Sequence, residues 1–132
     1  MYKLILVTIL LFFSASANAL ESLKSLSQLK EHHIIFLVFE KNGCPWCVRY
    51  KSELDYIIKQ KYKTDIKFFK VQKGSEISSQ LRKEFGHKII IYPMTYILKL
   101  NSNKESEIVH EIYGYQTVEY IEDIFQNELF IK

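Results

Sequence analysis

The residues from Ile34 to Phe39 form an unbroken apolar run, Ile-Ile-Phe-Leu-Val-Phe. The run is too short for a typical helix and is rich in β-branched and aromatic residues, which favours a strand. A strand without a polar side has to be buried on both of its faces, as in the centre of an α/β sheet that helices cover on both sides. This run therefore predicts a layered α/β fold.

The patterns on either side of this run predict the remaining elements. We expect an amphipathic helix over residues 20–30, a strand over 66–71, a helix from an N-cap at Ser75 to Gly86, an extended segment over 89–98 and a strand over 107–113. The helix that begins at Pro45 and ends near Lys61 is expected to bury Val48, Leu54, Ile57 and Ile58. The last helix, capped by Thr117, is expected to bury Val118, Tyr120, Ile121, Ile124, Phe125 and Leu129. This order predicts a mixed sheet of about four strands with helices on both faces.

The first residues have the pattern of a secretory signal peptide. Lys3 supplies a positive charge, residues 4–13 are almost entirely apolar, and small residues follow up to Ala17-Asn18-Ala19. This order with an A-x-A site predicts a signal peptide over residues 1–19 and one domain over residues 20–132. An uncleaved membrane anchor is the alternative, although the apolar run is shorter than the roughly 20 residues that span a bilayer. We therefore expect an exported protein, periplasmic if the source is bacterial, with no other membrane segment.

The charge balance and the cysteine count exclude several classes of protein. The formal net charge of +3 comes from 18 basic and 15 acidic residues. Because these charges form no basic stripe, we expect no nucleic-acid partner. The chain has only two cysteines, Cys44 and Cys47, and a small domain held together by disulfides carries more of them, far apart in sequence. The pair is therefore better explained by chemistry than by structural support.

Cys44 and Cys47 flank Pro45 and Trp46 where the predicted central strand gives way to a helix. A sulfur at a helix N-terminus lies near unpaired N–H groups and the positive end of the helix dipole, and both favour the thiolate. Such settings lower the pKa of a cysteine from about 8.5 to roughly 3.5–7.5. We expect Cys44 to attack a substrate and Cys47, one turn inside the helix, to resolve the mixed disulfide. Trp46 would offer an apolar surface to a protein substrate.

Two other interpretations of the cysteine pair stay open. Half of a zinc site would need two further ligands, and His32, His33, His87 and His110 lack the usual ligand spacing, so we expect no metal. An inert structural disulfide is the second alternative, and the strand-to-helix position argues against it.

These residues resemble the thioredoxin superfamily. The apolar strand followed by Cys44-Pro45-Trp46-Cys47 is similar to that family's active-site segment, and Tyr92-Pro93 with the strand after it looks like its cis-proline segment. The sequence from Gly114 to Thr117 resembles the last strand-to-helix junction of the family. The resemblance covers nearly all of residues 20–132 and implies a thioredoxin-like fold. The Cys-Pro-aromatic-Cys form is similar to glutaredoxins and to some periplasmic disulfide enzymes.

The resemblance also implies roles for residues outside the cysteine motif. The Tyr92–Pro93 bond would be cis and face the cysteines, with the backbone of Tyr92 free to pair with an extended substrate. An ordinary trans proline at a strand edge is the alternative. Many thioredoxins have an acid six positions before the first cysteine, where this chain has Val38. Glu40 is the nearest acid, and it would either transfer the proton of the resolving cysteine or be a solvated loop residue.

The sequence thus predicts a monomeric protein-disulfide oxidoreductase. It would act on protein thiols and disulfides with a redox partner protein and no cofactor besides the Cys44–Cys47 disulfide. A reductase or general thioredoxin-like role is favoured over an oxidase, and both stay open. The rival hypothesis is a non-catalytic thioredoxin-like module of a secretion or assembly complex, in which the disulfide is structural.

Overall fold

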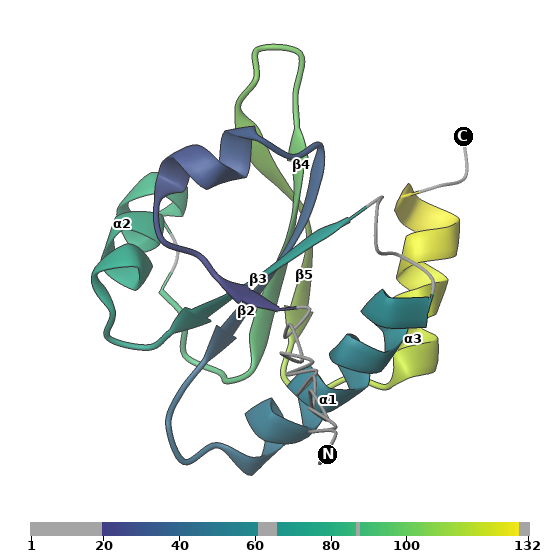
Figure 1. The fold of residues 1–132 in the computed structure, drawn as a ribbon. Coiled ribbons are helices and arrows are strands. Elements are labelled where there is room, and N and C mark those ends of the chain that lie inside the picture. Colours follow the sequence, from purple (N-terminus) through teal and green to yellow (C-terminus); the bar gives the residue numbers. More distant parts are fainter. Residues whose placement is uncertain (1–19, 61–65, 87, 130–132) are drawn as a thin grey trace, which may run out of the picture.

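The computed structural model describes residues 20–60, 66–86 and 88–129 (Figure 1). The strands are β1 (Glu21–Ser22), β2 (Ile34–Glu40), β3 (Lys67–Gln72), β4 (Met94–Leu100) and β5 (Ser106–Tyr113). The helices are η1 (Leu26–Lys30), α1 (Pro45–Gln60), α2 (Glu76–Phe85), α3 (Val118–Ile124) and the π-helical turn η2 (Phe125–Leu129). The signal peptide predicted over residues 1–19 lies outside the described residues.

A mixed sheet forms the middle layer of the domain. Its strands lie in the order β1-β3-β2-β4-β5, with β1, β3 and β2 parallel and with β4 and β5 each antiparallel to its neighbour. Figure 1 shows α1 and α3 on one face of this sheet and α2 on the other. The predicted α/β fold with helices on both faces is confirmed, and β1 adds a fifth strand to the four that were expected.

The start of the domain differs from the helix predicted over residues 20–30. The helical part begins only at Leu26 and is a 3₁₀-helix, while Glu21 and Ser22 pair with Phe69 and Lys70 of β3. The N–H of Leu23 continues this pairing by donating to the carbonyl of Lys70. The edge of β3 thus offers hydrogen bonds to the chain before η1, and this long-range pairing overrides the local helical pattern.

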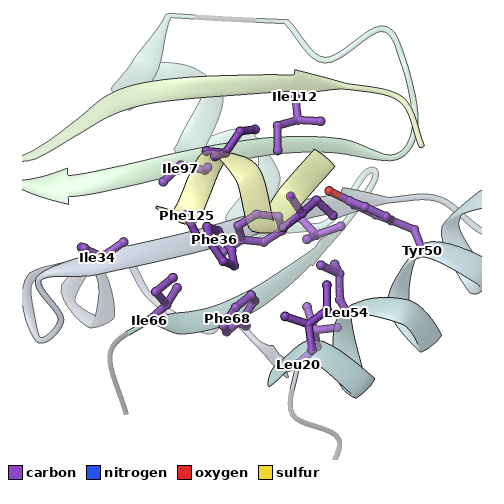
Figure 2. Packing of buried hydrophobic residues seen from close by; sticks show 14 residues of the cluster. Leu20, Ile34, Phe36, Tyr50, Leu54, Ile66, Phe68, Ile97, Ile112 and Phe125 are labelled. Atoms are coloured by element: carbon purple, nitrogen blue, oxygen red, sulfur yellow. The ribbon is translucent and has the colours of Figure 1, made fainter. Parts of the chain in front are cut away.

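The central strand β2 divides the core in two. All seven of its residues are buried, as expected for a strand covered on both faces. Ile34, Phe36 and Val38 point toward α1 and α3, and the residues between them point toward α2 and η1. Figure 2 shows the cluster on the α1 side, in which Phe36 packs against Phe68 and Phe125. These contacts fix both helical layers relative to β2 and so fix the chain that leaves its end.

Helix α1 buries a different stripe from the one predicted. Leu54 and Ile57 are buried as expected, but Val48 is 63% exposed. The buried stripe consists of Cys47, Tyr50, Leu54 and Ile57, at the spacing of three and four residues that one face of a helix requires. Val48 lies about 100° around the helix from Cys47 and falls outside this stripe. The side chain of Ile58 lies outside the described residues.

One further burial prediction was wrong, and the predicted strand over residues 107–113 contains an irregularity. Tyr120 is 43% exposed, because it precedes Ile121 and faces away from the sheet, whereas Ile121, Ile124 and Phe125 are buried as predicted. In β5 the register shifts where Ile97 pairs with His110 and Leu98 with Ile108. This β-bulge leaves Val109 without a partner, and it explains why the alternation of β5 is imperfect.

The α1 stripe predicts a large difference in stability between two positions of one helix. Leu54→Ala removes a fully buried side chain and should lower the free energy of unfolding by about 2–5 kcal/mol. Tyr56→Ala, at an exposed position of the same helix, should change it by no more than about 0.5 kcal/mol. Urea denaturation of both oxidised variants measures the difference, and equal midpoints would contradict the core assigned to α1.

Candidate active site

The two cysteines lie at the start of α1, a few residues after the end of β2. A turn at Asn42 and Gly43 joins β2 to the helix, and Gly43 has a φ of 70°, a conformation that favours glycine. Cys44 immediately precedes α1, and its carbonyl accepts a hydrogen bond from the N–H of Val48. Cys44 and Cys47 form a disulfide, with their Cα atoms 5.3 Å apart. The sequence predicted the cysteines at this junction between strand and helix, and the structure confirms that position.

The Cys44 sulfur lies between the helix N-terminus and the segment before β4. The backbone N–H of Cys47 donates a hydrogen bond to it over 3.2 Å, and the carbonyl oxygen of Tyr92 lies 3.7 Å away. The Tyr92–Pro93 peptide bond is cis, and Pro93 is buried. Once the disulfide is reduced, the N–H of Cys47 would donate to a thiolate, which strengthens the bond and favours the charged sulfur. The site therefore favours an ionised Cys44.

A buried hydrogen bond connects the cysteine helix to the strand after Pro93. The hydroxyl of Tyr50 on α1 lies 3.0 Å from the side-chain oxygen of Thr95 on β4, and both residues are fully buried. Burial raises the pKa of Tyr50, so this hydroxyl stays neutral. Figure 2 shows the ring of Tyr50 in the core beneath α1, with its hydroxyl directed toward the sheet. This bond holds the helix that carries Cys47 at a fixed place against β4.

One of the two predictions for Glu40, that it is a solvated loop residue, is wrong. It is the last residue of β2, it is only 8% exposed, and its carboxylate lies 2.5 Å from the Nζ atom of Lys51 on α1. Glu40 and Lys51 line an open hollow of about 380 Å³ together with Cys44 and Cys47. A buried carboxylate needs a charged partner, and Lys51 provides it. The structure thus places one carboxylate in the same hollow as Cys47.

Trp46 and Pro45 form the exposed rim of the site. Trp46 is 54% exposed, and its ring packs 5.2 Å from that of Tyr115, which follows β5. The guanidinium of Arg49 lies over both rings, and the hydroxyl of Tyr115 donates to the carboxylate of Glu53 over 2.5 Å. This hydrogen bond raises the pKa of Tyr115. The exposed indole is therefore held on one side by an aromatic and a cationic neighbour.

The sequence did not predict the partners of the cysteine motif. Tyr50 could have been recognised from its position three residues after Cys47 in the buried stripe of α1. Thr95 lies in β4 two residues after Pro93, next to the segment that contacts Cys44. Lys51 and Tyr115 carry no comparable pattern, because their contacts join segments distant in sequence.

The remaining predictions about the site concern metals and membranes. Among the described residues, no group of three or more His, Cys, Asp or Glu side chains is arranged to hold a metal ion. His32 contacts Phe69, and His110 pairs with Glu128. His87 lies outside the described residues. No helix in the described part of the chain has the length and apolar character needed to cross a bilayer.

Comparison with known proteins shows similarity in structure alone. No protein-family model matches the sequence, and no curated protein matches it. A thioredoxin from Trichomonas vaginalis is similar with a TM-score of 0.65 and 18% identity, over 83% of this chain and 98% of that one. A thioredoxin-like protein from Clostridium perfringens has a TM-score of 0.63 and 20% identity, over 90% and 89%. Thioredoxin f2 from Chlamydomonas reinhardtii has a TM-score of 0.61 and 19% identity, over 83% and 96%. At these identities the likeness establishes the fold.

The bond between Tyr50 and Thr95 predicts a specific pattern of stability. Thr95→Val leaves a buried hydroxyl without a partner and should cost about 1–3 kcal/mol. The double variant Tyr50→Phe/Thr95→Val removes both polar groups and should be more stable than the sum of the two single changes implies. Urea denaturation of the four oxidised proteins gives this coupling energy. A coupling energy of zero would show that the two hydroxyls do not depend on each other.

Proposed function

We propose that this chain, which has the thioredoxin fold, is a thiol–disulfide oxidoreductase that acts on exported proteins through Cys44 and Cys47. The observation that carries the proposal is the position of the Cys44 sulfur. It lies at the start of α1, receives a hydrogen bond from the N–H of Cys47 and is 3.7 Å from the carbonyl oxygen of Tyr92. A sulfur in this position is activated by the helix and has a backbone segment beside it on which a substrate strand can dock.

The reaction begins when the reduced protein meets a substrate disulfide. The Cys44 thiolate attacks one substrate sulfur, so that a bond forms between Cys44 and the substrate while the substrate disulfide breaks. The second substrate sulfur leaves as a thiolate and takes up a proton. Cys44 is the attacking residue because it precedes the helix, with 6% of its surface exposed against 2% for Cys47.

The second step releases the substrate. The carboxylate of Glu40 accepts the proton of the Cys47 thiol through the hollow that both residues line. The Cys47 thiolate then attacks the Cys44 sulfur, which forms the intramolecular disulfide and expels the substrate as a thiolate. Lys51 neutralises Glu40 while the carboxylate is charged. The disulfide form seen in the structure is the product of this step.

Pro45, Trp46, Tyr92 and Pro93 shape the surface on which the substrate binds. An extended substrate segment pairs with the backbone of Tyr92 and so brings its own sulfur to Cys44. Trp46 offers its exposed ring to the apolar side chains of the substrate. Because the contacts with the backbone are independent of sequence, this mode suits an enzyme with several protein substrates.

The proposed setting follows from the sequence of residues 1–19, which has the pattern of a signal peptide. The protein would work outside the cytosol, in the periplasm if the source is bacterial, with a redox partner protein that restores the thiols. The cysteine pair itself donates two electrons as dithiol and accepts two as disulfide, so the reaction needs no further cofactor. We favour a reductase or general thioredoxin-like role, because α2 is the only helix in the described chain between β3 and β4. Dedicated oxidases carry a large helical insertion, as the family resemblance implies.

The first test separates an enzyme from a binding module with a structural disulfide. In the reduced protein, Cys44 should be alkylated at rates that reach half of their maximum well below pH 8.5, the ordinary value for a cysteine. The protein should also catalyse the reduction of insulin by dithiothreitol, and Cys44→Ser should abolish this catalysis. A Cys44 that titrates as an ordinary thiol, with no catalysis of insulin reduction, would favour the binding module.

The second test concerns Glu40. Glu40→Gln should slow the release of the mixed disulfide about 10-fold or more at neutral pH, because the Cys47 thiol loses its base. The defect should shrink as the pH rises, since hydroxide then deprotonates Cys47. Acid quenching at timed intervals measures the mixed disulfide, and Glu84→Gln at an exposed position of α2 is the control. A release rate that is unchanged at every pH would exclude Glu40 from proton transfer, and a thermal melt checks that the variant is folded.

A further inference from the structure

A second cavity, lined by Tyr92, shares no lining residue with the hollow that Glu40 lines. It has a volume of about 230 Å³ and lies between α2, the end of β3 and the segment before β4. Its polar lining includes Lys73, Ser78, Ser79, Arg82, Lys88 and Tyr92. The described residues that line it include three basic side chains and no carboxylate. The cavity is smaller than the roughly 300–1,000 Å³ of small-molecule sites, so its size suits a side chain better than a cofactor.

The positive charges of this region converge on one aromatic ring. The Nζ atoms of Lys41 and Lys73 lie 5.8 and 5.5 Å from the centre of the Tyr92 ring. Burial raises the pKa of Tyr92, and the positive charge of Arg82 opposes that rise, which places the guanidinium within electrostatic reach of the phenol. The three cations come from the loop before Cys44, from the end of β3 and from α2. A cavity with this lining attracts an anion.

Tyr92 connects this cavity to the reacting sulfur. Its side chain lines the cavity, and its carbonyl oxygen lies 3.7 Å from the sulfur of Cys44. Neighbouring residues of an extended strand are only about 3.3 Å apart along the chain. A substrate strand that pairs with the backbone of Tyr92 and places its cysteine at Cys44 would therefore carry a nearby side chain over the cavity.

The hollow that Glu40 lines has a weaker charge. There the carboxylate of Glu40 and the ammonium group of Lys51 neutralise each other at 2.5 Å. An acidic substrate side chain would gain nothing from that pair, whereas Lys73, Arg82 and Lys88 have no carboxylate beside them in the described lining of the cavity. Lys41 also lines the hollow, so its described lining carries one net positive charge, against three for the cavity. The stronger attraction for an acidic side chain therefore lies on the α2 side of the site.

We propose that this basic cavity binds the carboxylate of an Asp or Glu that lies one or two residues from the reactive cysteine of a protein substrate. The proposal rests on the proposed function and adds the substrate class: extended segments with an acid beside the cysteine. The charges raise the rate of encounter and fix the register of the bound strand. Because the cavity is open to solvent, the preference weakens as the salt concentration rises.

A thiol peptide measures this preference without regard to the direction of electron flow in the cell. The thiolate of the peptide attacks the Cys44 sulfur of the oxidised protein, a peptide–Cys44 disulfide forms, the Cys44–Cys47 bond breaks, and Cys47 leaves as a thiolate. Two peptides that differ only by Glu or Gln beside the cysteine are compared at low ionic strength. Each rate is divided by that of the same peptide with dipyridyl disulfide, which removes differences in thiol reactivity.

We expect the Glu peptide to react about 10-fold faster than the Gln peptide, with the ratio approaching one at 1 M salt. The double variant Lys73→Gln/Arg82→Gln should bring the ratio close to one, and Arg82→Glu should favour a Lys peptide instead. Lys83→Gln is the matched control, because it removes a neighbouring α2 charge that does not line the cavity. Equal rates for both peptides with the unmodified protein would overturn the proposal, and so would an equal loss of the preference in Lys83→Gln.

A binding measurement separates this proposal from the proposed function. Peptides with Ser in place of Cys cannot react, and their binding is followed by the amide NMR shifts of Lys73, Ser78 and Arg82. The Glu peptide could bind more strongly at these amides while the Cys peptides show no thiol exchange. This result would support acid binding by the cavity and refute the proposed oxidoreductase activity. Exchange at equal rates, with no shift difference between the peptides, would support the enzyme and overturn the proposal for the cavity.

Discussion

The position of the cysteine pair depends on the burial of β2 from both sides. Its apolar residues bring α1 against one face and α2 against the other, and β4 pairs with it along its length. The chain that leaves β2 at Glu40 must therefore enter α1 beside the beginning of β4, where Pro93 lies. The hydrogen bond between Tyr50 and Thr95 then fixes the helix to that strand. The packing of the core therefore determines that Cys44 lies beside Tyr92, and the loop between β2 and α1 does not determine it alone.

Much of this arrangement could be predicted from the sequence because the signals are local. The run from Ile34 to Phe39 indicates a central strand, Ser75 and Gly86 delimit α2, and Cys44-Pro45 indicates the start of α1. The short strand β1 could not be predicted, since Glu21 and Ser22 adopt it only through their pairing with β3. The exposure of Val48 was predictable in principle, because the spacing of Cys47, Tyr50, Leu54 and Ile57 identifies the buried stripe.

The charges around the cysteines could not be predicted in the same way. The ion pair of Glu40 and Lys51 joins the end of β2 to α1, and the cations near Tyr92 come from three separate segments. Charged side chains recur throughout the chain, so their positions in sequence do not reveal which of them meet. Only the packing of the helices on both faces of β2 brings these groups together around the end of that strand.

The position of Glu40 also shows how the site differs from the thioredoxin pattern. The position at which many thioredoxins have an acid is Val38 here, which is fully buried in the core on the α1 side. Glu40 follows two residues later on the same face of β2, nearer to the end of the strand, where it reaches Lys51 and the hollow beside Cys47. An acid at position 38 would lie in the core opposite Thr95, where the described structure offers it hydroxyl groups but no cation. At position 40 a carboxylate has a charged neighbour in Lys51 and lines the same hollow as the two cysteines, while the core around Val38 stays apolar.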